Sequence, residues 1–237
     1  MTVLTLSTSS AAALRADAVV VGVAKGAKSP VVAAGAEAVD KAFGGKLAAV
    51  LETLGATGAE GEVTKLPSAS GLKAPVVLAV GLGEVPAKGD GYDAETLRRA
   101  AGVASRALSG SKKGAFALPI GSAADAGAVA EGALLGAYAY DKGNGNGKNA
   151  KDKKNNGPLA EVALVGTKPR DKEYKAAAER ATALVAEVNR ARDLINTPSN
   201  VLTPAARSAA GAGGPRAQSP KKPNLGPDCE AKTGVGR

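Results

Sequence analysis

Two continuous apolar runs, at residues 17–23 and 75–82, constrain the fold of this 237-residue chain most strongly. They read DAVVVGV and PVVLAVGL. A strand with one face in water alternates apolar and polar residues, whereas a strand covered on both faces is apolar throughout. The two runs therefore predict central strands of a sheet that lies between two other layers.

Strand and helix patterns alternate along the rest of the chain. Further strands are expected at residues 3–6, 61–66, 114–119 and 159–165. Helices are expected as two short segments within 30–54, broken near Gly44 and Gly45, and at 93–108, 122–140 and 172–195. This order predicts an α/β protein, a three-layer α/β/α sandwich with a mixed or mostly parallel sheet.

Composition excludes several kinds of active site. The chain has no histidine and a single cysteine, Cys229. Ser-His and Cys-His nucleophiles, His-containing metal sites and thiolate metal sites are therefore excluded, and no intrachain disulfide can form. No apolar run approaches the ~20 residues of a membrane span. The N-terminus, MTVLTLSTSS, lacks the basic start of a secretory signal, so we expect a cytoplasmic protein without a membrane partner.

The net charge of +9 suggests nucleic-acid binding, but the positions of the charges along the chain do not support it. Residues 141–156 hold five Lys and two Asp, which gives +3, and residues 205–237 hold six Lys or Arg, one Asp and one Glu, which gives +4. The rest of the chain therefore carries only +2. A basic groove on the folded body is not indicated.

Two short segments contain residue types that catalysis or binding could use. Glu60 and Glu62 could form a carboxylate pair for acid–base chemistry. They stand at the start of an expected strand, which favours a solvated strand edge. Gly81-Leu82-Gly83 could cradle a phosphate. Pro86 stands where the third glycine of a dinucleotide fingerprint belongs, which favours a plain strand-to-loop turn.

The acidic residues before the expected helix at 93–108 have structural interpretations. Asp90 is interpreted as a turn residue and Asp93 as the helix N-cap. On that helix Leu97, Ala101 and Ala104 fall on one face, as a core-facing helix requires.

Three longer segments carry the strongest signal. The first is VLAVGLG at 77–83 followed by LRRAAG at 97–102, and the second is EGALLGAY at 131–138. The third, VNRARDLINTPSNVLTP at 188–204, begins as the end of an amphipathic helix and stops before Pro198. In this order the three segments resemble the N-terminal domain and interdomain segment of the leucyl (cytosol) aminopeptidase family.

The resemblance implies a macro-like, non-catalytic N-terminal domain. The family consists of hexameric metallopeptidases that release N-terminal amino acids, preferably leucine, from peptides. Two divalent ions, Zn or Mn, are held in the C-terminal domain. The metal-binding block of that domain, of the type N-T-D-A-E-G-R-L, occurs nowhere in this sequence. No catalytic, cofactor-binding or metal-binding residue is therefore assigned, and the chain alone is expected to be inactive. Arg192 and Asp193 are interpreted as a capping or hinge pair near the domain interface.

The resemblance also divides the chain into segments. Residues 1–170 are expected to form the macro-like domain, with a flexible polar loop at 141–158, and residues 171–205 the interdomain helix and linker. Residues 206–237, rich in Gly and Pro, are expected to be a disordered tail foreign to the family. A truncation or reading-frame change before the catalytic domain would explain that shift. The isolated chain is expected to be a monomer or a weak oligomer.

An alternative function is that of a binding module. Macro domains bind ADP-ribose, so the loops after the parallel strands could bind ADP-ribose or another nucleotide. The basic segments could bind DNA. The lysine-rich stretch at 142–154 has no interleaved aromatic residues for base stacking, which favours a solvated linker.

Overall fold

The computed structural model describes residues 2–27, 29–87, 90–140 and 157–198, together with positions 202 and 208. Contacts divide the chain into two units, residues 1–193 and 194–237. The first unit holds the whole sheet and is the one described below. The loop expected at 141–158, apart from residues 157 and 158, and the tail from 206 on, apart from residue 208, lie outside the described residues.

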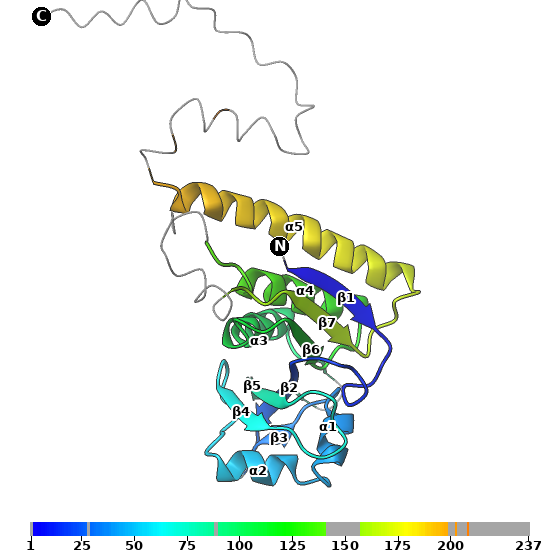
Figure 1. Cartoon of the computed structure of the whole chain (residues 1–237). Helices are drawn as coiled ribbons and strands as arrows, with labels where there is room; N and C mark the ends of the chain where they lie inside the picture. Colours follow the sequence, from blue (N-terminus) through cyan, green and yellow to red (C-terminus); the bar gives the residue numbers. More distant parts are fainter. Residues whose placement is uncertain are drawn as a thin grey trace, which may run out of the picture. The chain divides into compact units, whose positions relative to one another are not determined.

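The helices and strands follow the alternation expected from the sequence (Figure 1). The strands are β1 (Val3–Ser7), β2 (Ala18–Lys25), β3 (Val31–Val32), β4 (Val63–Pro67), β5 (Val76–Glu84), β6 (Lys113–Ala117) and β7 (Glu161–Val165). The helices are α1 (Glu37–Ala42), α2 (Leu47–Thr53), α3 (Ala94–Ala107), α4 (Ala123–Gly136) and α5 (Lys172–Asn196).

The seven strands of the described residues form one mixed sheet in the order β1-β7-β6-β2-β5-β4, with β3 paired to β2. The five strands from β1 to β5 in that order are parallel. β4 is antiparallel to β5, and β3 is antiparallel to β2. The two long apolar runs of the sequence are β2 and β5, which pair with each other near the middle of the sheet.

The central strand β2 supplies side chains to two separate cores. Val20 packs with α3 and α4 on one face of the sheet, and Val19 and Val21 pack with α1 and α2 on the other. Tyr174 and Ala181 of α5 belong to the first core. The sheet therefore lies between two helical layers, which confirms the expected three-layer α/β sandwich with a mixed sheet (Figure 1).

The structure corrects the sequence expectations at three places. β3 has only two residues, too few to produce a periodic pattern, and it was not expected. α4 ends at Gly136 instead of continuing to Tyr140. Gly81-Leu82-Gly83 is not a turn but part of β5, which continues to Glu84 and pairs with β2 as far as that residue.

Candidate functional site

Parts of the three segments that carry the family resemblance lie on the helices α3, α4 and α5, whereas VLAVGLG at 77–83 lies in β5. Residues 97–102 are in α3, residues 131–136 form the end of α4, and residues 188–196 form the end of α5. α3 and α4 lie side by side, and α5 runs past the β1 end of the sheet (Figure 1). Up to residue 193, the motif segments thus lie on elements of the first unit.

Glycines allow α3 and α4 to approach each other closely. A Cβ atom on Gly132 would lie 2.0 Å from the carbonyl oxygen of Arg98, and one on Gly136 would lie 2.2 Å from that of Gly102. Both distances are far below van der Waals contact, so only glycine fits at either position without moving the helices. The glycines of the EGALLGAY segment are therefore needed for helix packing.

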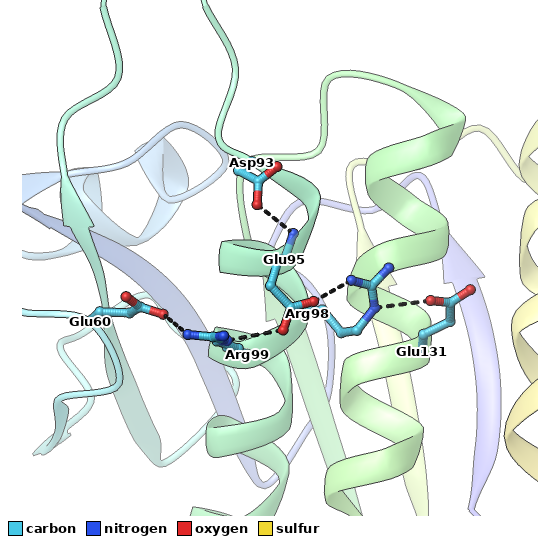
Figure 2. Close-up of polar contacts among 6 residues, drawn as sticks. All are labelled: Glu60, Asp93, Glu95, Arg98, Arg99 and Glu131. Carbon is cyan, nitrogen blue, oxygen red and sulfur yellow. Dashed lines mark hydrogen bonds and ion pairs between the residues drawn. The ribbon is translucent and has the colours of Figure 1, made fainter. Parts of the chain in front are cut away.

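A chain of charged side chains crosses this helix pair (Figure 2). Arg98 donates from Nη1 to Glu95 at 2.6 Å and from Nε to Glu131 of α4 at 3.0 Å. Arg99 donates from Nε to Glu95 at 3.0 Å and from Nη1 to Glu60 at 3.1 Å. The network links the loop before β4, α3 and α4.

The network favours the charged forms of Glu95, Arg98 and Arg99. Hydrogen bonds from Arg98, and then from Arg99, lower the pKa of Glu95. Burial alone would lower the pKa of Arg98, but the bonds to Glu95 and Glu131 raise it overall. A general acid or base works best with a pKa near the operating pH. These shifts lead away from that range, so the network is suited to joining elements and not to proton transfer.

A second polar contact joins α4 to α5. The Tyr138 hydroxyl donates to Oδ1 of Asp193 at 2.9 Å, and the Arg192 guanidinium lies 3.9 Å from the centre of the Tyr138 ring. Arg192 also donates from Nη1 to the carbonyl oxygen of Leu135 at 3.2 Å. The structure thus places Arg192 and Asp193 against the end of α4, where they bind the last two motif segments together.

The sequence pair Glu60 and Glu62 does not form a two-carboxylate site. Glu60 faces Arg99, whereas the Glu62 carboxylate accepts bonds from the Thr57 hydroxyl at 2.8 Å and from three successive backbone amides, those of residues 57–59. Burial raises the pKa of Glu62, but the bonds from Thr57, Ala59 and Gly58 outweigh it and lower the pKa overall. Glu62 is the anion of a backbone nest within its own loop.

Glycine is required at position 81 because a neighbouring backbone segment leaves no room for a side chain, and not because a phosphate binds there. A Cβ atom at this position would lie 1.7 Å from the carbonyl oxygen of Ala59. The amide of Gly81 donates to the Glu62 carbonyl, and the Gly81 carbonyl accepts from Gly61. The loop before β4 therefore fills the space that a phosphate would need.

Two helices, α3 and α4, follow parallel strands, and aspartates of this chain accept hydrogen bonds from the backbone amides at the N-termini of both. Asp93 accepts from the amide of Glu95 at the start of α3, which confirms the expected N-cap. Asp125 accepts from the amides of Gly121 and Ser122 at the start of α4. Helix N-termini bind phosphates through such amides. Carboxylates on those amides repel a phosphate and count against the nucleotide-binding alternative.

One pocket lies between the end of α4, the start of β1 and α5. Its volume is about 490 Å³, and its lining includes Thr2, Leu134, Tyr138, Val185 and Asp193.

Within the described residues, no three His, Cys, Asp or Glu side chains are grouped as metal ligands. No helix in the same ranges is long and apolar enough to cross a membrane.

Sequence reasoning did not single out Arg98, Glu131 or Tyr138 as contact residues. All three fall inside the motif segments, and that was the only signal available. The order of the helices along the sequence does not show that Arg98 of LRRAAG faces Glu131 of EGALLGAY. That contact follows from the packing of α3 beside α4 on one face of the sheet.

Comparison with known proteins assigns the family. Residues 20–144 match the family description "Cytosol aminopeptidase family, N-terminal domain". The match covers more than half of the chain, and it contains α3 and α4 with the network between them. The chain belongs to the cytosol aminopeptidase family, and this part of it is the family's N-terminal domain.

Individual relatives agree with this assignment. The chain is 71% identical over 211 residues to a probable cytosol aminopeptidase of Streptomyces griseus subsp. griseus, a match that covers 86% of this chain and 41% of that protein. A second, from Streptomyces coelicolor, is 66% identical over 218 residues, or 88% of this chain and 42% of that protein. The chain therefore spans about two fifths of the length of these relatives.

Solved structures show the same architecture. The bottromycin maturation enzyme BotP in complex with Mn is 32% identical, with a TM-score of 0.57, over 82% of this chain and 35% of that one. A mutant of tomato leucine aminopeptidase superposes with a TM-score of 0.67 at 18% identity, over 88% of this chain and 41% of that one. The second likeness concerns the fold alone.

Proposed function

We propose that this chain serves as the non-catalytic N-terminal domain of a cytoplasmic aminopeptidase and does not hydrolyse peptides by itself. The observation that supports this most is that the carboxylates near the motif segments have binding partners within the chain. Glu60, Glu95 and Glu131 are held by arginines, and Glu62 is held by backbone amides. A two-metal hydrolase needs carboxylates free to bind both ions.

The proposal includes the organisation of the chain and of its longer relatives. Residues 1–170 form the macro-like domain, residues 171–205 the connection, and residues 206–237 a separate tail. In the complete relatives we place the chemistry, the two divalent ions (Zn or Mn), the preference for N-terminal leucine and the hexameric assembly in the part that this chain does not match. The Mn named for BotP supports a metal-dependent reaction in the family.

The test is hydrolysis of leucine p-nitroanilide by the purified chain with Mn²⁺ or Zn²⁺ added. We expect no turnover above the blank. The matched control is the Streptomyces griseus relative, purified in the same way, which we expect to release leucine faster than other residues. Turnover that co-purifies with this chain through successive columns would overturn the proposal.

A further inference from the structure

α5 presents an apolar stripe to solvent. Leu184 is 42% exposed and Val188 38% exposed, although both are on a helix whose Tyr174, Ala181 and Val185 are buried. Ala191 is exposed as well. The spacings of four and three residues place the three exposed side chains in one line along the helix. Neither Leu184 nor Val188 lines the pocket beside α5.

Opposite charges flank this stripe on one side. At 100° per residue, Arg180 lies about 40° and Glu187 about 60° from Leu184 in the same sense of rotation. Buried Ala181 and Val185 lie on the other side of the stripe, at about 60° and 100°. Arg180 and Glu187 are both exposed. The stripe thus has one flank against the core and one exposed charged flank, and Glu187 of the charged flank also lines the pocket beside α5.

The two charges are arranged so that a second copy of the helix complements them. Arg180 lies about 6 Å before Leu184 along the axis, and Glu187 about 4.5 Å after it. A two-fold axis perpendicular to α5 at Leu184 reverses the helix and keeps the charged flanks on the same side. Arg180 of each copy then lies beside Glu187 of the other. A parallel arrangement would instead place the charged flank of one copy opposite the core flank of the other.

One long ion pair within α5 competes with such a contact. Glu187 has an ion pair to Arg190 of its own helix at 3.8 Å, which is near the outer limit for one. Within the described part of the chain, Arg180 makes no ion pair. We propose that α5 docks antiparallel on α5 of a second copy of this chain, with Leu184 at the two-fold axis and two Arg180–Glu187 pairs between the copies.

The apolar centre of this contact is small. Interfaces below ~1,000 Å² belong to weak or transient complexes. The dimer is therefore expected to dissociate at low micromolar concentrations and to form as the concentration rises. High salt should weaken it further, because at 1 M salt the screening length is only about 3 Å.

Sedimentation velocity over a wide concentration range tests the proposal with the full chain. We expect a reversible monomer–dimer equilibrium, and we expect Leu184→Ser to weaken it at least about tenfold. Leu54→Ser is the matched control, because Leu54 is 53% exposed at the end of α2, away from α5. This control should dimerise as the unmodified chain does. Thermal unfolding of each variant establishes that the fold is kept.

Charge reversal tests the register of the two helices. Arg180→Glu and Glu187→Arg should each weaken the dimer, because each places like charges opposite one another. The double variant should restore it, because the pairs are re-formed with their signs exchanged. A chain that is monomeric at every concentration, a dimer indifferent to Leu184→Ser, or a double variant no better than the single ones would each overturn the proposal.

Discussion

At the scale of single residues, two glutamates in one loop have different roles. Glu60 and Glu62 are separated by one glycine, yet one binds an arginine of α3 and the other binds the backbone of its own loop. Three successive amides and a hydroxyl on one carboxylate oxygen make Glu62 an internal anion. The loop that it closes is the one that packs on Gly81 of β5.

Glu62 should make the stability of the domain depend on acidic pH. Its pKa is lower in the folded chain than its ordinary value of 4.5. The stabilisation is therefore complete above that ordinary value and is lost as the pH falls through the folded value. Glu62→Gln should cost about 1 to 2 kcal/mol at neutral pH, because charged hydrogen bonds are lost, and progressively less below pH ~4. Urea unfolding across a pH series measures this.

Glu52→Gln, a change at an exposed position of α2, is the control for that series and should shift stability by less than about 0.5 kcal/mol. If Glu62→Gln cost the same free energy at pH 3 as at pH 7, the carboxylate would not be the group that holds the loop.

At the scale of helices and strands, local patterns predicted the elements, whereas packing distances had to come from the structure. The apolar runs located β2 and β5, and Asp93 located the start of α3. The separation of α3 and α4 was not predictable. Gly132 and Gly136 lie in a helical pattern, and the sequence alone does not show why glycine stands there. The carbonyl groups of the facing helix show that close packing of the two helices requires it.

Gly132→Ala should therefore destabilise the domain even though alanine is the better helix former. Its Cβ atom would lie 2.0 Å from a backbone oxygen, so the helices must separate, and we expect a cost of about 2 to 3 kcal/mol. Gly127→Ala on the same helix is the control. The Cβ atom there would lie 3.6 Å from that of Ala177, an ordinary contact, and helix propensity should stabilise by up to about 1 kcal/mol. Chemical unfolding that ranks the two variants in the opposite order would contradict this account.

At the scale of the whole molecule, the sequence predicted the sandwich and the structure shows which residues complete it. The first core closes only when Tyr174 and Ala181 of α5 cover it, and the contact of Tyr138 with Asp193 fixes the same helix further along. α5 is therefore part of the folded unit. In the proposed organisation α5 connects two domains, and its first half also has the role of a core helix.

Two truncations separate these roles. A chain of residues 1–196 keeps every strand and helix of the first unit, so its melting temperature should lie within about 5 °C of that of the full chain. A chain of residues 1–171 loses the buried side chains of Tyr174 and Val185, each contributing about 1.5 to 3 kcal/mol. Its melting temperature should fall by about 10 °C or more, or its unfolding should lose cooperativity. Circular dichroism melts measure both.

If the shorter chain melted at the same temperature as the longer one, α5 would be an appendage. If the 1–196 chain were the one to lose stability, residues beyond 196 would belong to the folded unit.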